Sequence, residues 1–322
     1  MGRSKHSTQV AAAPPTATVQ PGLVVGSHGR HCLVESPDGG RRICHPRGKK
    51  SQAVVGDRVQ WLPSTDEGTI ERVDTRRNLF YRQDEIRTKS FAANLDQILM
   101  LVAAEPDFSE HQLARALIAA EAEHIRALIV LNKSDLPGLF SPAWERLAPY
   151  RRMGYGVLPL SLKDAGASGL AEVQAELAGR TTLILGPSGV GKSTLVNRLV
   201  PSALAQTGEI SQALNSGRHT TTTTTWYWMD KPAGTALIDS PGFQEFGLHH
   251  IEPTQLPALM PDIAAHTGEC RFYNCTHRHE PGCGVIAHVE GDERNGTSDA
   301  DISTMRYRIY NELFDELSRS AY

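Results

Sequence analysis

Two patterns of apolar and polar positions divide the chain. From residue 21 to residue 75, short apolar runs rich in β-branched residues are separated by Gly, Pro and Asp turns; they read GLVVG, RHCLVE, AVVGDRVQWL and GTIERV. Strands this short and this closely spaced are typical of a small antiparallel barrel, for which the OB-fold is the leading candidate. We therefore predict an N-terminal all-β OB-fold over residues 21–75.

A different pattern starts near residue 92. Four runs with apolar centres alternate with helical stretches; they cover residues 96–104, 126–132, 181–186 and 234–240. Continuous apolar strands separated by helices indicate a mostly parallel sheet that is buried on both faces. The pattern predicts an α/β domain over residues 92–250, joined to the barrel by a linker at residues 76–91.

Both ends of the chain lack such strands. Residues 1–20 hold few large apolar side chains and two consecutive prolines, which predicts a disordered tail. Residues 251–322 contain a Cys/His cluster and then apolar residues at helical spacing within 301–317, namely Ile302, Met305, Ile309 and Leu313. We predict a partly helical, zinc-binding C-terminal domain whose last helix packs against the rest of the chain.

Composition favours a soluble cytoplasmic protein of two or three globular domains. The chain has 322 residues, of which 40% are hydrophobic and 21% charged, and this excludes fibrous and wholly disordered classes. No apolar run approaches the roughly 18 residues that span a membrane. Three of the five cysteines crowd into residues 270–283, which favours a metal site in a reducing compartment over a disulfide framework. We expect Cys32 and Cys44 to be ordinary core residues.

The formal net charge of −3 hides an asymmetry. Residues 1–90 carry 15 Lys and Arg against 9 Asp and Glu, so this part is net +6 and the remainder is net −9. The excess is concentrated in Arg41, Arg42, Arg47, Lys49 and Lys50. Such a cluster favours a polyanion such as RNA as a partner, although a solvated basic loop explains the charge equally well.

The segment TTLILGPSGVGKST predicts a phosphate-binding loop. Gly186, Gly191, Lys192 and Ser193 match the G-x-x-x-x-G-K-[ST] pattern in full, between a buried strand and a helix. Glycines allow the backbone N–H groups to surround phosphate oxygens, and the helix N-terminus adds partial positive charge. Lys192 is expected at the β- and γ-phosphates and Ser193 on Mg²⁺. The alternative, a glycine-rich turn with a chance lysine, fits this context poorly.

The segment RALIVLNKSD predicts a preference for guanine. A buried strand delivers Asn132, Lys133 and Asp135 to its carboxyl end, where open α/β sheets bind ligands. One carboxylate accepts both the N1–H and the N2 amino group of guanine, whereas adenine offers neither donor, so Asp135 discriminates between the bases. Taken alone, NKSD is also compatible with a helix-capping turn.

The segment GTALIDSPGF places Asp239 and Gly242 in a D-x-x-G arrangement at the end of the buried run 234–240. Asp239 is expected to hold Mg²⁺ largely through water, and the Gly242 N–H to contact the γ-phosphate. A plain strand-to-turn Asp-Ser-Pro-Gly is the alternative. Upstream, six threonines run from residue 220 to residue 225, and Thr221 is the expected Mg²⁺ ligand of an order–disorder switch, with a register uncertain by one residue. The later threonines alternate with aromatics and are also compatible with the start of a strand.

Phe243 stands where many GTPases have the glutamine that orients the attacking water. Because phenylalanine cannot do this, we expect another group to act, and His219 is the candidate. We hypothesise slow intrinsic hydrolysis that a partner accelerates by ordering this loop.

The motifs stand in permuted order, because NKSD precedes the phosphate loop and Asp239. Permutation leaves a site intact, since function depends on where the strand ends meet in space. The segment SLKDAG at 161–166 stands where a contact to the guanine O6 is expected, through Ser161, Leu162 and Lys163.

Cys270, Cys275, His277 and Cys283 form C-x4-C-x-H-x5-C. Three thiolates and one imidazole make a closed tetrahedral shell, which suits one structural Zn²⁺ and leaves no open position for catalysis. His279 and His266 lie nearby in sequence, so the histidine ligand is less firmly assigned than the cysteines. Unconnected buried cysteines are the alternative.

With NKSD, GPSGVGKST, GRHTTT, DSPGF and CRFYNCTHRHEPGC in this order, the chain resembles the ribosome small-subunit-dependent GTPase A family. The resemblance runs from residue 21 to the C-terminus and implies a circularly permuted α/β P-loop GTPase domain between an OB-fold and a zinc domain. It implies binding to the small ribosomal subunit and its rRNA, and subunit-stimulated GTP hydrolysis during late maturation. The family's zinc ligands map onto the four residues above, and its hydrolytic histidine onto His219. The threonine run is longer than the family's.

The expected cofactors are GTP/GDP with Mg²⁺ and one structural Zn²⁺, in a monomer without membrane contact. The expected catalytic residues are Lys192, His219 and Thr221, and the expected magnesium ligands are Ser193, Thr221 and Asp239. The expected GTP-binding residues are Asn132, Lys133, Ser134, Asp135, Ser161, Leu162, Lys163, Gly186, Pro187, Ser188, Gly189, Val190, Gly191, Lys192, Ser193, Thr194 and Gly242.

Two other functions fit part of this pattern. A guanine-nucleotide sensor that regulates another RNA or protein target with little hydrolysis is compatible with Phe243. An ATPase would require Asp135 to be irrelevant.

Overall fold

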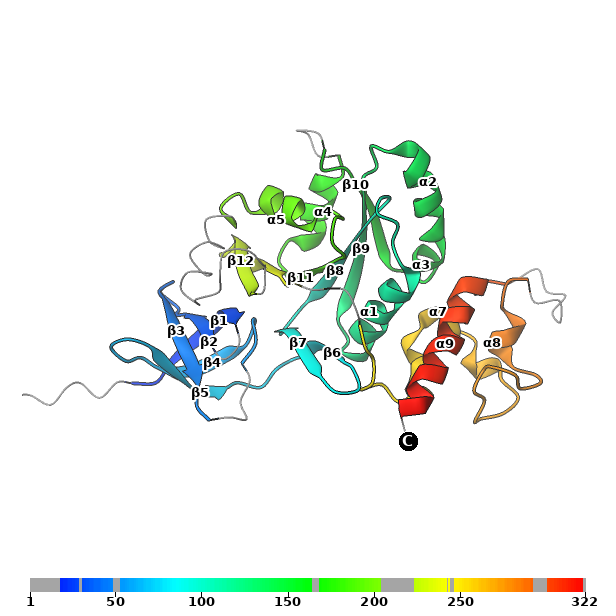
Figure 1. Cartoon of the computed structure of the whole chain (residues 1–322), viewed down its shortest axis with the longest axis horizontal. Coiled ribbons are helices and arrows are strands. Elements are labelled where there is room, and N and C mark those ends of the chain that lie inside the picture. The colour runs from blue at the N-terminus through cyan, green and yellow to red at the C-terminus, as the bar shows by residue number, and fades with distance from the viewer. Residues whose placement is uncertain are drawn as a thin grey trace, which may run out of the picture.

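The structure is a computed structural model that describes residues 18–28, 31–48, 53–163, 168–203, 223–241, 243, 246–291 and 300–320. Three parts follow one another along its long axis (Figure 1). A β-barrel lies at one end, an α/β domain in the middle and a group of short helices with one long helix at the other end. The predicted fold class is confirmed. Within the described ranges, no helix is long and apolar enough to cross a membrane.

The barrel consists of five strands. These are β1 (Gln20–His28), β2 (His31–Glu35), β3 (Arg41–Pro46), β4 (Arg58–Leu62) and β5 (Gly68–Val73). They pair in the order β1-β2-β3-β5-β4, and β4 pairs back with β1, which closes the barrel. Cys32 and Cys44 face each other across β2 and β3 and are buried, as predicted for core residues.

The basic segment differs from the predicted loop. Residues 41–46 form β3, and two basic side chains of the segment pair with carboxylates of the barrel. Arg41 pairs with Glu35 at 2.9 Å, and Arg47 pairs with Glu71. Lys49 and Lys50 lie outside the described residues. Sequence reasoning missed this strand because its charged residues hid the short apolar alternation.

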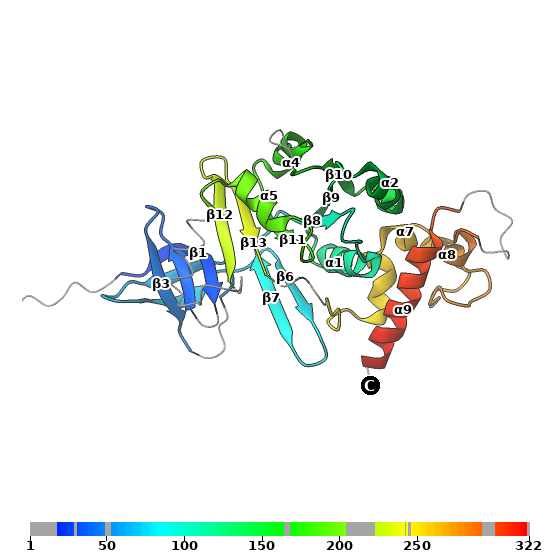
Figure 2. The same cartoon turned by 45° about the horizontal axis from the view of Figure 1, so that its top comes forward.

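The segment predicted as a linker contains a hairpin, formed by β6 (Leu79–Gln83) and β7 (Thr88–Ala93). The hairpin projects beside β13 between the barrel and the C-terminal helices (Figure 2). It is therefore a structured element and not only a connection.

The sheet of the middle domain contains the four predicted strands. These are β8 (Gln97–Ala103), β9 (Arg126–Asn132), β11 (Thr181–Leu185) and β13 (Thr235–Asp239); β10 (Gly156–Leu160) and β12 (Thr224–Asp230) lie at its two edges. All neighbours are parallel except β12, which is antiparallel to β13. At that edge β1 of the barrel pairs with β12, so that one sheet of hydrogen-bonded strands passes from barrel to α/β domain.

Helices cover both faces of this sheet. Helices α4 (Leu170–Leu177) and α5 (Lys192–Leu199) pack on one face, against side chains such as Leu99 and Val130. Helices α1 (Glu110–Ala122), α2 (Pro137–Arg146) and α3 (Ala148–Arg152) contribute to the core on the other face, with Met100 and Ile129. Alternate residues of each strand thus enter different cores, which explains the continuous apolar runs.

The C-terminal part packs against α1 through η1 (Pro253–Leu259). Its other helices are α7 (Pro261–Ala264), η2 (Thr267–Glu269), α8 (Gly284–Ala287) and α9 (Thr304–Ser320). Ile309 and Leu313 of α9 are buried as predicted. Ile302 precedes the helix, and Met305 is exposed, so the apolar face begins one turn later than its spacing indicated.

Candidate nucleotide-binding site

The carboxyl ends of the parallel strands bring the sequence motifs together. Asn132 ends β9, Gly186 follows β11, and Asp239 ends β13, while Leu160 of β10 precedes Ser161. Because these strands run in the same direction, their ends meet at one edge of the sheet. Segments that are distant and permuted in the sequence therefore form one site.

The phosphate loop needs glycine at two positions for different reasons. Gly191 has φ of +98°, and a Cβ there would lie 2.6 Å from Asn132 Nδ2. Gly186 is buried, and a Cβ there would lie 2.5 Å from the Leu101 carbonyl oxygen. Ser188, Gly189, Ser193 and Thr194 are exposed around the loop, while Pro187 is partly buried and Val190 is buried. The loop is thus fixed from behind and open towards solvent.

Lys192 and Asp239 form an ion pair, and the Lys192 ammonium also donates to the Ser240 carbonyl at 3.2 Å. Lys192 begins α5, and Ser193 follows it with an exposed hydroxyl. One hydroxyl and one carboxylate on neighbouring elements suit Mg²⁺, which keeps several waters and phosphate oxygens. The residues present therefore fit the ion that a triphosphate brings.

The base-reading segment is held by hydrogen bonds on both sides. Asn132 Nδ2 donates to the Val190 carbonyl of the phosphate loop at 2.8 Å, and its Oδ1 is buried without a partner among the described residues. Ser134 N donates to the Leu160 carbonyl at 3.0 Å. Lys133, between them, has a φ of 69°. Asn132 therefore ties the two permuted motifs to each other.

Asp135 is oriented by the segment expected to read the O6 edge. Ser161 Oγ donates to Asp135 Oδ1 at 2.9 Å, and Lys163 Nζ lies 3.7 Å from Oδ2. The Ser161 hydrogen bond lowers the pKa of the Asp135 carboxyl, and Lys163 adds to this. Leu162 is buried beneath the segment. The carboxylate thus stays ionised and keeps acceptor capacity for two N–H donors.

The surroundings of Phe243 show that its side chain does not orient a water molecule. It is buried, and its ring lies 5.8 Å from that of Phe246, which in turn contacts Phe80 and Phe91 of the hairpin at 5.5 and 5.8 Å. His219, Thr221 and Gly242 lie outside the described residues. The later threonines do begin a strand, since Thr224 opens β12 and its hydroxyl lies 3.1 Å from that of Ser240.

Cys270, Cys275, His277 and Cys283 converge in the C-terminal part. Their ligand atoms all lie within 4.8 Å of one another. His277 Nδ1 lies 3.3 Å from Cys270 Sγ and 3.6 Å from Cys283 Sγ. Burial raises the pKa of Cys275 to about 12, and burial also raises the pKa of Cys283. Cysteine thiols ionise when a metal cation replaces their protons, so the donor set fits tetrahedral Zn²⁺.

His266, Glu269 and His288 form a second group of potential ligands nearby. The two imidazole rings stack with centroids 3.6 Å apart and planes inclined by 14°. Because ring lone pairs lie in the ring planes, those of two parallel rings do not converge on one point. His266 contacts Glu269 at 3.1 Å and Asp301 at 3.0 Å, and His279 is exposed. The geometry therefore favours His277 over both sequence alternatives.

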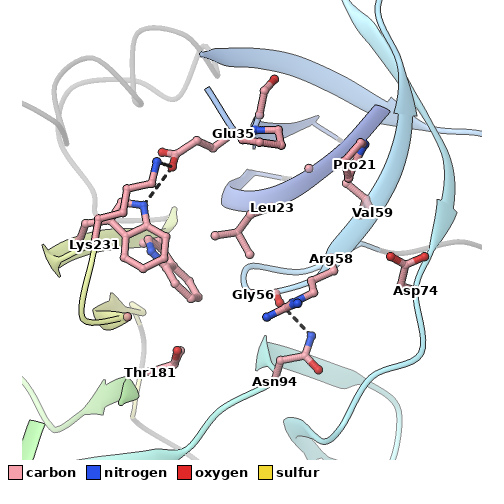
Figure 3. A pocket seen from close by; sticks show the side chains of 16 residues that line it. Pro21, Leu23, Glu35, Gly56, Arg58, Val59, Asp74, Asn94, Thr181 and Lys231 are labelled. Carbon is pink, nitrogen blue, oxygen red and sulfur yellow. Dashed lines mark hydrogen bonds and ion pairs between the residues drawn. The ribbon is translucent and has the colours of Figure 1, made fainter. Parts of the chain in front are cut away.

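A cavity of about 500 Å³ is lined by residues of both the barrel and the α/β domain (Figure 3). Glu35 of the barrel accepts hydrogen bonds there from Trp228 at 3.0 Å and Lys231 at 2.7 Å. Thr181, which lines the cavity, is the first residue of β11, so the cavity lies at the opposite edge of the sheet from the phosphate loop. It is not part of the nucleotide site.

A phosphate loop after β11, Asn132 and Asp135 at the end of β9 and an Asp beside the loop lysine define a P-loop GTPase fold, here with its segments circularly permuted. A family model described as RsgA GTPase matches residues 73–249. The chain belongs to the RsgA GTPase family and is a GTP hydrolase.

Relatives match along the whole chain. It is 66% identical over 322 residues to the small ribosomal subunit biogenesis GTPase RsgA of Variovorax paradoxus (strain S110), covering 100% of both chains. It is 50% identical over 300 residues to the protein of the same name from Burkholderia pseudomallei (strain K96243), covering 92% of each.

Two solved structures share the fold. The crystal structure of YjeQ from Thermotoga maritima is 29% identical with a TM-score of 0.69, over 94% of this chain and 99% of that one. The structure of YloQ, described as a circularly permuted GTPase, is 26% identical with a TM-score of 0.67, over 96% and 98%.

Proposed function

We propose that this chain binds the small ribosomal subunit and its rRNA and hydrolyses GTP during late maturation of that subunit, with hydrolysis stimulated by the subunit. The observation that carries the proposal is the end-to-end match to relatives named small ribosomal subunit biogenesis GTPase. The protein acts in the cytoplasm as a monomer. The domain limits are 21–75, 92–250 and 251–322, with the tail at 1–20 and the hairpin segment 76–91 between the first two.

Different residues of the site contact the guanine base, the phosphates and Mg²⁺ in this proposal. Asp135 accepts the N1–H and N2 amino group of guanine, with Asn132 and the Lys133 stem beside the base and residues 161–163 at its O6 edge. The N–H groups of Gly186 and of residues 188–191 surround the phosphates, and Lys192 leaves Asp239 to contact the β- and γ-phosphates. Ser193, Asp239 and Thr221 would hold Mg²⁺, which would neutralise charge on the phosphate oxygens. Thr194 adds a contact at the start of α5.

Hydrolysis requires a group other than Phe243, whose side chain is buried among aromatic rings. His219 is the proposed residue that positions the attacking water, and Gly242 the proposed γ-phosphate contact. In this proposal the subunit stimulates hydrolysis by acting on the segment that carries His219 and Thr221. The four-ligand Cys/His cluster binds one structural Zn²⁺. The chain's membership in a GTPase family disfavours the sensor that barely hydrolyses GTP.

The experiment that tests this proposal is GTP turnover by the purified protein alone, with small ribosomal subunits and with large subunits. Strong stimulation by small subunits alone is the expected result. Equal turnover in all three samples would contradict the ribosomal role and leave the nucleotide site standing.

A further inference from the structure

The cavity lined by the barrel and the α/β domain has the size and the walls of a ligand site. Its volume of about 500 Å³ lies within the range of roughly 300–1,000 Å³ that small-molecule sites occupy, and such sites are common where two domains meet. Apolar side chains of both domains form its walls: Leu23 and the buried Val59 come from the barrel, and Trp226 and Trp228 come from β12. A molecule that fills the cavity therefore contacts both domains.

The carboxylates and the amide of the lining already have partners. Glu35 accepts hydrogen bonds on both of its oxygens, including the one from Lys231 at 2.7 Å. Asp74 also accepts hydrogen bonds on both oxygens. The amide of Asn94 donates to the Gly56 carbonyl at 2.9 Å, and its oxygen accepts a backbone N–H at 2.8 Å. The acidic lining groups therefore do not require a cation as ligand.

Two donors of the lining lack such partners. The Arg58 side chain is exposed at the cavity and makes no hydrogen bond or ion pair within the described ranges. Trp226 is 4% exposed, and its indole N–H is buried without a partner in the same ranges. Figure 3 shows Leu23 between the pair of Glu35 with Lys231 and the guanidinium of Arg58. The cavity thus combines apolar walls with donors that have no acceptor, which favours an anionic ligand.

We propose that this cavity binds a small organic anion with a flat apolar body, of the aromatic carboxylate class. The apolar body packs against Leu23, Val59 and the tryptophans, which removes apolar surface from water. The carboxylate accepts from Arg58, because the planar guanidinium presents two N–H donors that match two carboxylate oxygens. An uncharged molecule of the same shape leaves Arg58 without an acceptor. The site lies at the opposite sheet edge from the phosphate loop, so the ligand does not compete with GTP.

The test measures binding of 2-naphthoate to the full-length protein by titration calorimetry, with 2-naphthamide as the uncharged probe of the same shape. The variants are Arg58→Gln, which removes the cation, and Leu23→Trp, which fills the cavity with a larger side chain. Arg47→Gln is the matched control, because Arg47 is an exposed cation of the same barrel outside the cavity lining. GDP affinity and thermal unfolding are recorded for each variant.

We expect wild-type protein to bind one equivalent of 2-naphthoate, and to bind 2-naphthamide at least about tenfold more weakly. Arg58→Gln should weaken 2-naphthoate binding about tenfold and leave 2-naphthamide binding unchanged, since only the carboxylate uses the cation. Leu23→Trp should bind neither probe, and Arg47→Gln should behave as wild type. GDP affinity should stay within about twofold of wild type in every variant, and saturating GDP should not displace 2-naphthoate.

Three results would overturn the proposal. They are no saturable binding of 2-naphthoate to wild type, equal affinities for the acid and the amide, and full 2-naphthoate affinity in Arg58→Gln. If Leu23→Trp did not fold, Arg58→Gln would still decide, because the substitution lies at an exposed side chain. Failure of the ribosomal role is visible separately, since these titrations use neither subunits nor GTP hydrolysis.

Discussion

At the residue scale, the candidate site was largely predictable because each motif couples a residue type to a fixed place at a strand end. Asn132, Asp135, Lys192 and Asp239 are brought to one edge of the sheet, as their positions after buried strands indicated. The hydrogen bond from Lys89 to the Pro241 carbonyl was not predictable. A lone lysine between polar residues gives no sign of the carbonyl 152 positions away that it meets only after folding.

Asp135 supplies the first prediction. Asp135→Asn replaces an acceptor-only carboxylate by an amide, so the affinity for GTP should fall at least tenfold, or about 1.4 kcal/mol, while xanthosine triphosphate, whose C2 carbonyl accepts a hydrogen bond, should gain. Competition binding with GTP, ATP and xanthosine triphosphate checks this. If the variant kept its GTP preference, Asp135 would not read the base and the ATPase alternative would return.

Cys275 supplies the second prediction. Cys275→Ser should release about one zinc per chain and lower the free energy of unfolding by about 2 kcal/mol or more, because the C-terminal part loses its metal anchor. Elemental analysis and urea unfolding measure both effects. His279→Asn, at an exposed neighbouring histidine, should change neither. Full zinc content in Cys275→Ser would rule out this ligand set.

At the element scale, strands buried on both faces were predictable, whereas the edge strand β10 and the strands of the β6–β7 hairpin were not. The runs that became β8, β9, β11 and β13 are apolar on both faces because helices cover both. In contrast, β10 is an edge strand that contains Pro159, and β6 and β7 carry charged residues, of which Lys89 donates to the Pro241 carbonyl. The residues of a strand do not show which other segment of the chain it will pack against.

Helix α9 carries a buried ion pair that gives the third prediction. The side chains of Arg306 and Asp262 are only 3% and 7% exposed, and Arg306 Nε lies 2.8 Å from Asp262 Oδ2. Asp262→Ala leaves the Arg306 charge buried without its carboxylate, which should cost about 3–5 kcal/mol of stability. Arg308→Met on the same helix removes an exposed pair with Glu312 and should cost less than about 1 kcal/mol. Urea unfolding of both variants measures the difference, and equal costs would contradict the burial argument.

At the scale of the whole molecule, the barrel is attached to the strand that follows the threonine run. Gly26 and Ser27 of β1 pair with Thr225 and Thr224 of β12, and Thr225 pairs with Asp239 of β13. Glu35 adds a second attachment through Trp228 and Lys231. A displacement of the barrel is therefore transmitted to the nucleotide site through these few hydrogen bonds.

Removal of the second attachment gives the fourth prediction. Glu35→Ala should leave unstimulated GTP turnover within about twofold of wild type, because Glu35 lies far from the phosphate loop, and should lower stimulation by small subunits severalfold. Turnover with and without subunits measures this, with Asp38→Ala, an exposed acidic residue in the following turn, as the control. Full stimulation in Glu35→Ala would show that this attachment does not couple barrel and site.

The pairing of β1 with β12 also bears on solubility. The outer strand of a sheet offers unpaired N–H and C=O groups to any other strand, and proteins protect such edges. Here the barrel shields the edge at β12 and lies beside Trp228. A fragment that begins at residue 76 would bare that edge, and we expect it to self-associate where the whole chain does not, which light scattering at matched concentrations would detect. By its pairing with β12 the barrel covers an edge of the α/β sheet that would otherwise be open to strands of other chains.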